Sequence, residues 1–323
     1  MTKGKFVISL DFEMYWGIRD VINLNDYKEN LLGIRESVPL LLYHFKKYDI
    51  NATFATVGFL FFQNKNALNK NLPSKKPDYF NSGLSPYNGH IQSIGKDEID
   101  DPFHFGASLV DQILEARQEI GSHSFSHFYC LEKGQSTQDF REDLLAAKKI
   151  AEQKGIDLRS FVFPRNQYNE QYINTCAEMG FTSFRGNEKS WLFSSETLGP
   201  FMNFRRPFRL LDSYINISGN NCYSFKDLKG YKIVNIPSSR FLRPYSKSFK
   251  AFENLRLKRI TDSMSYAAKK GLVYHLWWHP HNFGINQSEN FSFLEKILRH
   301  YKKLNEKFSF ESVNMQQLTK EIL

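Results

Sequence analysis

Two histidines four residues apart, His123 and His127 in the stretch GSHSFSH, are the first group in the chain that could do chemistry. On a helix this spacing would place both imidazoles on one face, as in the zinc-binding pattern of paired helical histidines. The stretch opens with Gly121, however, and follows Glu119 and Ile120, which are typical of a short strand. We therefore expect both imidazoles to lie at the end of a buried strand.

A pair of acids ends the first apolar segment of the chain. Residues 5–11 (KFVISLD) are apolar and rich in β-forming side chains, as expected of a buried strand. Asp11 and Glu13 stand two residues apart, so their carboxylates point to the same side of an extended chain. A carboxylate and two neutral imidazoles are a common ligand set for a catalytic metal that keeps one position open for water. The sequence therefore predicts a metal site of Glu13, His123 and His127, with Zn²⁺ as the expected ion and Co²⁺, Ni²⁺ or Mn²⁺ as alternatives.

Three further residues could carry out hydrolysis at such a site. Asp11, outside the ligand set, is the candidate base that accepts a proton from the activated water. Arg165, after another predicted strand, could keep Asp11 ionised through a charge-assisted pair. His279 is the candidate proton donor to the leaving group, and His281 is the alternative. His275 stands in the middle of an apolar segment and is expected in the core.

Residues beside these groups are candidates for substrate contact. Asn166 lies in the stretch FPRN, and His281 lies in HLWWHPHN. Trp16 and Trp278 have aromatic faces that could stack on a substrate at the mouth of a barrel, and packing in the core is the alternative for both.

Strand-like and helix-like segments alternate along the chain, which favours an α/β fold with a parallel sheet. With about seven such units, a closed or nearly closed, distorted (β/α) barrel is expected, and an open doubly wound sheet is the alternative. Active sites of such barrels form at the strand ends, so the candidate residues would converge there. Strands are expected at residues 5–11, 52–56, 119–120, 160–163, 181–184, 231–237, 272–277 and in the tail. Helices are expected at 27–47, around 109–113, from 137 to a stop at 155, at 169–179, 250–270 and 288–303, and after Asn314. Asn314 could form a capping box with Gln317 at the start of the last helix.

Two stretches break this alternation. Residues 63–105 are rich in Asn, Lys, Ser, Pro and Gly and show little periodicity. We expect them to form a long insertion loop over one rim of a single domain that spans residues 1–323, either partly ordered and facing the substrate or disordered. Residues 191–228 give no interpretable pattern.

Composition limits the class of protein. The 323 residues are 41% hydrophobic, enough to bury a substantial core. Three widely separated cysteines exclude a disulfide framework. The opening residues do not resemble a signal peptide and no apolar run is long enough for a membrane span, so a cytoplasmic protein is expected. The formal charge of +9 is scattered, which argues against nucleic-acid binding but could recruit an anionic, lipid- or nucleotide-linked substrate at a membrane surface. The oligomeric state is left open.

Four motifs in this order resemble those of the polysaccharide deacetylase family, the NodB-homology carbohydrate esterases. They are the acids at 11–13, the histidines at 123–127, FPRN at 163–166 and WWHPHN at 277–282, and the resemblance covers residues 5–323. It implies a distorted (β/α) barrel and a metal, usually zinc, that serves to hydrolyse an N-acetyl or similar amide on a sugar. It further implies Asp11 as the base, His123 and His127 as metal ligands, and His279 as the acid.

The motifs also depart from the common pattern. The spaced acid pair resembles a divergent intracellular branch, which implies a precursor of cell-surface polysaccharide or lipopolysaccharide as substrate. The family arginine precedes its prolines, so Arg185, Arg205 or Arg206 could replace Arg165, and Asp212 could orient the acid histidine. Removal of an acetyl or formyl group from an amino sugar is the expected reaction. Hydrolysis of a non-sugar amide or cyclic imide, and a catalytically silent glycan-binding barrel, are the alternatives.

Overall fold

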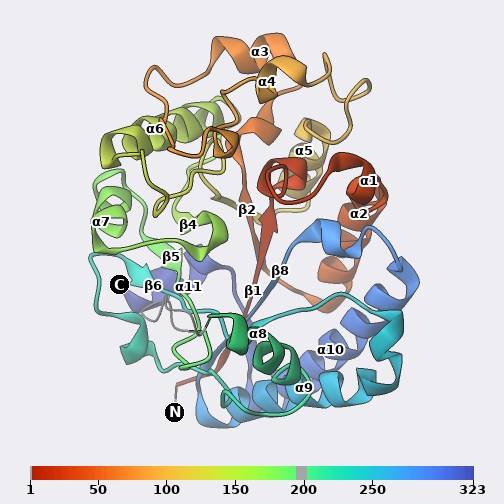
Figure 1. Cartoon of the computed structure of the whole chain (residues 1–323). Coiled ribbons are helices and arrows are strands. Elements are labelled where there is room, and N and C mark those ends of the chain that lie inside the picture. The colour runs from red at the N-terminus through yellow and green to blue at the C-terminus, as the bar shows by residue number, and fades with distance from the viewer. Residues whose placement is uncertain (1, 194–201) are drawn as a thin grey trace.

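The strands of the protein form one parallel sheet in the computed structural model, which describes residues 2–193 and 202–323. They are β1 (Lys5–Phe12), β2 (Ala52–Thr56), β3 (Glu119–Ser122), β4 (Ser160–Val162), β5 (Ser183–Arg185), β6 (Val234–Asn235), β7 (Arg240–Phe241), β8 (Val273–Trp278) and β9 (Glu311–Ser312). Their order is β6-β5-β4-β3-β2-β1-β8-β7, with β9 also paired to β1. Most neighbours follow one another in sequence, without the reversal of a doubly wound sheet, and the sheet curls into a half-barrel with helices around it (Figure 1). The predicted α/β fold, a distorted (β/α) barrel, is therefore confirmed.

The first strand is the centre of the sheet. All eight residues of β1 are buried, and it pairs with β2 on one side and β8 on the other. Strands covered on both faces are continuously apolar, which explains why residues 5–11 could be recognised. Within the described residues, β6 and β7 form no ladder with each other, so the half-barrel has an open seam between them.

Every helix predicted from the sequence is present, and one of them is divided. The expected helix at 27–47 is divided at Gly33, where an added Cβ would lie 1.9 Å from the carbonyl oxygen of Gly284. The predicted capping box of Asn314 and Gln317 is present. The helices are α1 (Leu24–Leu32), α2 (Ile34–Tyr48), α3 (Lys65–Lys70), α4 (His90–Ser93), α5 (Ala107–Glu115), α6 (Thr137–Gln153), α7 (Glu170–Glu178), α8 (Met202–Leu211), α9 (Glu253–Lys270), α10 (Gln287–Phe308) and α11 (Met315–Ile322).

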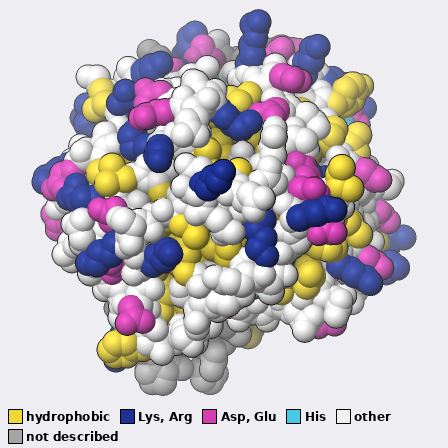
Figure 2. Space-filling view, turned by 90° about the horizontal axis from the view of Figure 1, so that it is seen from above, with side chains coloured by type: hydrophobic (Ala, Val, Ile, Leu, Met, Phe, Trp, Pro, Cys, Tyr) yellow, Lys and Arg dark blue, Asp and Glu magenta, His cyan; other side chains and the backbone are white. Residues whose placement is uncertain are grey.

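Residues 63–105 contain α3 and α4 and lie at the top of the molecule in Figure 1. The backbone of this segment holds the turn after β1, because Trp16 Nε1 donates to the carbonyl of His104 at 2.8 Å and Arg19 Nη1 donates to that of Gly83 at 2.8 Å. Figure 2 shows this face, on which Lys and Arg side chains are interspersed with Asp and Glu. That residues 63–105 are an insertion within one domain stays a prediction.

A helix lies in the uninterpreted stretch 191–228, and a strand that the sequence did not indicate lies beyond it. α8 lies in the stretch 191–228, and β7 follows that stretch with only two strand residues, too few for a recognisable period. In the part of the chain that is described, no helix is both long and apolar enough to cross a membrane.

Candidate metal centre

Glu13, His123 and His127 lie together at the carboxyl ends of β1 and β3. The Nε2 atoms of His123 and His127 lie 3.2 Å and 3.1 Å from Glu13 Oε2. All three candidate ligand atoms lie within 4.8 Å of one another, and all three side chains are buried. Atoms that bind one zinc ion tetrahedrally lie about 3.3 Å apart, so the residues predicted from sequence have a spacing that suits a shared ion.

The tautomer of His123 supports this fit. Its Nδ1 lies 2.8 Å from the carbonyl oxygen of Val162, which can only accept, so Nδ1 must donate. In the neutral ring Nε2 then carries a lone pair, and this lone pair faces the carboxylate of Glu13. Two acceptors facing each other in a buried place call for a cation between them or for a second proton on the ring.

Burial and charge set the ionisation of the other two groups. Burial would raise the pKa of Glu13, but the nearby His279, His123 and His127 together hold that pKa well below its usual value. Burial lowers the pKa of His127, which favours the neutral ring that a metal needs. The Nδ1 atom of His127 is buried without a partner in the described chain, so Nε2 is its functional end.

Gly17 fixes the place of the Glu13 carboxylate. It ends the 3₁₀ turn Met14–Gly17 that follows β1, and a Cβ on it would lie 2.0 Å from Glu13 Cδ. Any larger residue at position 17 would therefore displace the carboxylate.

Asp143 of α6 holds the loop that carries the second histidine, and sequence reasoning missed it. Its carboxylate accepts from the backbone N–H groups of Phe125 (2.6 Å) and Ser126 (3.1 Å), and from the hydroxyl of Ser126 (2.5 Å). His127 has a left-handed backbone conformation, with φ of 59°, which is costly for a residue with a side chain. These bonds help to maintain it. An acid on the apolar face of the 137–153 helix was the available signal.

Arg185, not Arg165, holds the candidate base. Its Nη1 and Nη2 lie 2.6 Å and 2.8 Å from the two oxygens of Asp11, and its side chain is fully buried. Burial would raise the pKa of Asp11, but Arg185, with His123 and His279, lowers it, so the carboxylate is ionised. Arg185 was one of the alternatives from the sequence.

Arg165 lies elsewhere, which corrects its predicted role. It has a left-handed backbone (φ 53°) after β4, pairs with Asp20 at 2.5 Å and stacks 4.3 Å from the ring centre of Tyr129. Arg205 and Arg206 fall among residues 202–206, whose side chains lie outside the described part of the structure.

The histidines after β8 differ in their surroundings. His279 Nε2 lies 3.5 Å from Glu13 Oε1 and 3.7 Å from Asp11 Oδ2, and the side chain is 23% exposed, so it faces both acids and remains accessible. His281 stacks on His279 with ring centres 5.0 Å apart, and burial lowers its pKa to about 3. His275 is fully buried against Ser9, at 2.8 Å, as expected of a core residue.

The two predicted tryptophans are not at the site. Trp16 and Trp278 are fully buried, and Trp278 packs against Phe45 and Phe283. Side chains alternate along a strand, so Trp277 instead turns inward, where its ring lies 4.1 Å below the Arg185 guanidinium. Asn166 lies behind the site and accepts from Arg185 Nη2 at 3.2 Å. Its predicted substrate contact stays a prediction.

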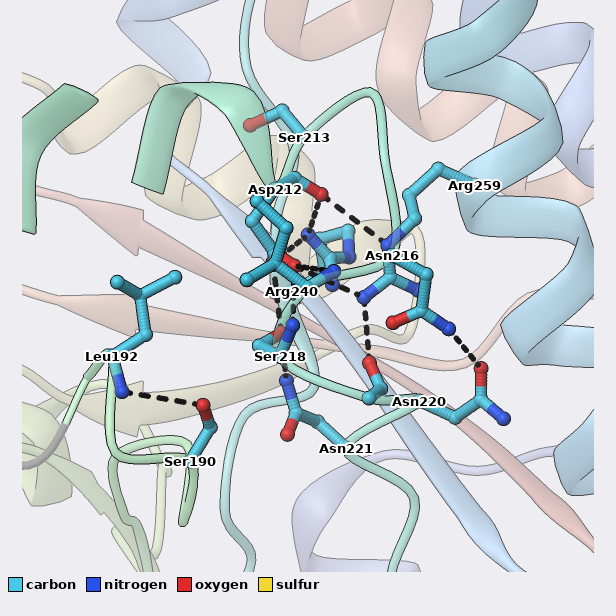
Figure 3. A network of polar contacts seen from close by, with 12 residues as sticks. Ser190, Leu192, Asp212, Ser213, Asn216, Ser218, Asn220, Asn221, Arg240 and Arg259 are labelled. Atoms are coloured by element: carbon cyan, nitrogen blue, oxygen red, sulfur yellow. Dashed lines mark hydrogen bonds and ion pairs between the residues drawn. The ribbon is translucent and has the colours of Figure 1, made fainter. Parts of the chain in front are cut away.

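Asp212, proposed to orient the acid histidine, belongs to a different cluster. It pairs with Arg240 at 2.9 Å and Arg259 at 3.5 Å and accepts from the backbone of Ser218 at 2.7 Å (Figure 3). These charged partners and its burial beside α9 keep it there, and no contact joins it to His279 within the described chain. The sequence-based role for Asp212 is therefore wrong.

A half-barrel whose strand ends gather acids, imidazoles and an arginine is the arrangement of a (β/α)-barrel enzyme. A family model described as polysaccharide deacetylase matches residues 22–184, which are 163 of the 323 residues. The chain belongs to the polysaccharide deacetylase family. The matched stretch includes His123 and His127 but not Asp11, Glu13 or His279.

Solved structures share the fold at low identity. A protein from Mycobacterium smegmatis assigned to the polysaccharide deacetylases has a TM-score of 0.61 and 12% identity, over 99% of this chain and 90% of that one. Puue allantoinase has a TM-score of 0.54 and 12% identity, over 98% of this chain and 88% of the allantoinase. Among curated protein sequences, none matches the chain significantly.

Proposed function

We propose that the protein is a metal-dependent hydrolase that removes an N-acyl group, acetyl or formyl, from an amino sugar. The observation that carries this proposal is the buried set of candidate ligand atoms on Glu13, His123 and His127, beside an acid that Arg185 keeps ionised. The family supplies the class of reaction, hydrolysis of an amide on a carbohydrate.

The residues divide the chemistry among them. Glu13, His123 and His127 would hold the divalent ion, which when bound acts as a Lewis acid on the acyl carbonyl and on water. Asp11 would accept the proton of the attacking water, and Arg185 keeps its carboxylate oriented for that step. The C–N bond then breaks, and His279 would deliver a proton to the departing amine. The products are a carboxylic acid and a free amino sugar.

Zinc is the proposed ion, with Co²⁺, Ni²⁺ and Mn²⁺ as alternatives, because two imidazoles and one carboxylate suit all of them. The proposed substrate is an intracellular precursor of a cell-surface polysaccharide or lipopolysaccharide, linked to a lipid or nucleotide. The scattered positive charge of the chain would attract either carrier.

Elemental analysis and a release assay test the proposal together. Purified protein is expected to bind about one zinc ion per chain and to release acetate or formate from an N-acylated amino sugar. A chelator should abolish release, and added zinc should restore it. Small amides and cyclic imides belong in the same panel, because turnover of these alone would assign a different substrate class. Ligand binding without any hydrolysis or metal would overturn the proposal.

A further inference from the structure

Five large apolar side chains are exposed on one surface formed by α8 and the start of α9. Each of these side chains is between 44% and 54% exposed. A group of large apolar side chains left exposed together is unusual on a protein surface. We call this set the α8 surface: Phe208, Leu211, Ile215, Phe252 and Leu255.

The side chains of the α8 surface lie on two segments that meet at Tyr214. Phe208, Leu211 and Ile215 follow helical spacing, and the turn continues to Ile215, whose N–H bonds to the carbonyl of Leu211 at 2.9 Å. The ring of Tyr214 lies 5.9 Å from that of Phe252, which joins this row to the start of α9. The chain just after α8 contacts α9, because Arg259 Nε donates to the carbonyl oxygen of Asp212 at 3.2 Å.

Cations border this surface. Lys247 and Lys250 are exposed in the turn that leads into α9, and neither forms an ion pair within the described residues. Glu253, the acid at the start of α9, is already paired with Arg256 at 2.5 Å. Aromatic and aliphatic side chains bordered by unpaired lysines suit an anionic lipid surface, which accepts the apolar groups and attracts the cations.

The surface lies next to the mouth of the candidate site. The ring of Phe241, at the end of β7, is 5.9 Å from that of His279. Two residues later, Arg243 Nε donates to Ser213 Oγ at 2.8 Å, and Ser213 precedes Tyr214. We propose that the α8 surface docks the protein onto an anionic lipid bilayer and so places the site mouth beside the membrane.

Vesicle flotation tests this docking without reference to catalysis. The full chain should float with vesicles of equal parts phosphatidylcholine and phosphatidylglycerol, and much less with phosphatidylcholine alone. Ile215→Glu should reduce the bound fraction about tenfold, whereas Ile99→Glu, the same change at a 94% exposed residue in the 63–105 segment, should not.

A second pair of variants separates the contribution of the lysine charges to vesicle binding from that of the apolar side chains. The double change Lys247→Gln/Lys250→Gln should weaken binding and its dependence on salt, and Lys269→Gln/Lys270→Gln, at the far end of α9, should not. Equal flotation of Ile215→Glu and Ile99→Glu, or no flotation of the unchanged protein, would overturn the proposal. A dimer in sedimentation velocity that Ile215→Glu converts to a monomer would assign the surface to a second copy instead.

Discussion

The metal centre and the Asp212 cluster are both buried and polar, but their hydrogen bonding differs. Around Asp212 the carboxylate meets donors, from Arg240, from Ser218 and from backbone N–H groups (Figure 3). At the candidate metal centre, the lone pair of His123 Nε2 faces the Glu13 carboxylate, and His127 Nε2 lies 3.1 Å from the same carboxylate oxygen. Both Asp212 oxygens meet donors of the chain, although Nε and Nη2 of Arg240 are buried without a partner in the described residues. The candidate metal centre instead needs a cation or extra protons.

This difference separates a structural cluster from a functional one more clearly than burial does. Both clusters have buried carboxylates whose pKa is held low, Asp212 mainly by Arg240 against the effect of burial and Glu13 by histidines against the same effect. A lowered carboxylate pKa alone would not have distinguished the two clusters. The balance of hydrogen-bond donors and acceptors around each carboxylate distinguishes them.

The largest effect should come from His127→Ala, which removes one of the three proposed ligands of the candidate metal centre. We expect bound zinc to fall from about one ion per chain to nearly none, and hydrolysis to fall at least about a thousandfold. Metal analysis and the release assay measure both. His275→Ala is the matched control, because this buried histidine lies outside the ligand set, and its folded fraction should keep the metal. Full metal content and turnover in His127→Ala would remove the contrast between the two clusters.

Arg185→Gln should sharpen the contrast within the site by leaving the metal but weakening the base. Without the guanidinium the pKa of Asp11 rises, so the acidic limb of the activity profile should move to higher pH and the rate should fall about a hundredfold. Arg165→Gln makes the same change at an arginine that pairs with Asp20, and its effect should be much smaller. The reverse ranking of the two variants would restore the role first predicted for Arg165.

Most of the fold and the candidate metal ligands could be predicted from the sequence, because both depend on local patterns. Apolar runs such as residues 5–11 indicate strands, and ligands at strand ends meet whenever the strands are parallel. The choice of Arg185 over Arg165 depends on a left-handed backbone at Arg165 and on the inward turn of the last residue of β5. The burial of Trp278 depends on which alternate residues of β8 face the core, and a shift of one residue in the strand reverses this choice. Such features follow from the assembled sheet and leave no local signal.

Asp212→Asn tests the structural cluster, and this change should reduce the stability of the protein but not its metal content. Arg240 and Arg259 would remain buried with no anionic partner in this cluster, at a cost of about 3–5 kcal/mol in the free energy of unfolding. Urea unfolding measures this loss, and bound metal in the folded protein should be unchanged. Asp262→Asn, which breaks an exposed pair with Lys258, should change stability by less than about 1 kcal/mol. Metal loss in Asp212→Asn would couple the two clusters.

His275→Gln should have the smallest effect at neutral pH, and it should act mainly on the pH dependence of stability. Burial lowers the pKa of His275 from 6.5 to about 3, so the unfolded chain binds a proton between these values that the folded chain does not. The stability from the neutral ring is present above pH 6.5 and is lost as pH falls, by up to about 1.4 kcal/mol per pH unit. The free energy of unfolding of His275→Gln should therefore fall less steeply on acidification. Parallel curves for the two proteins would contradict this assignment.

Gly17 shows how a residue without functional atoms can be as restricted as the residues that act. Because a Cβ at this position would overlap the Glu13 carboxylate, the constraint at Gly17 comes from its neighbour and not from its own backbone. In a saturation library selected for activity, only glycine should survive at position 17, just as only histidine should survive at positions 123 and 127. A survey of tolerated substitutions would then rank a bare glycine among the catalytic positions.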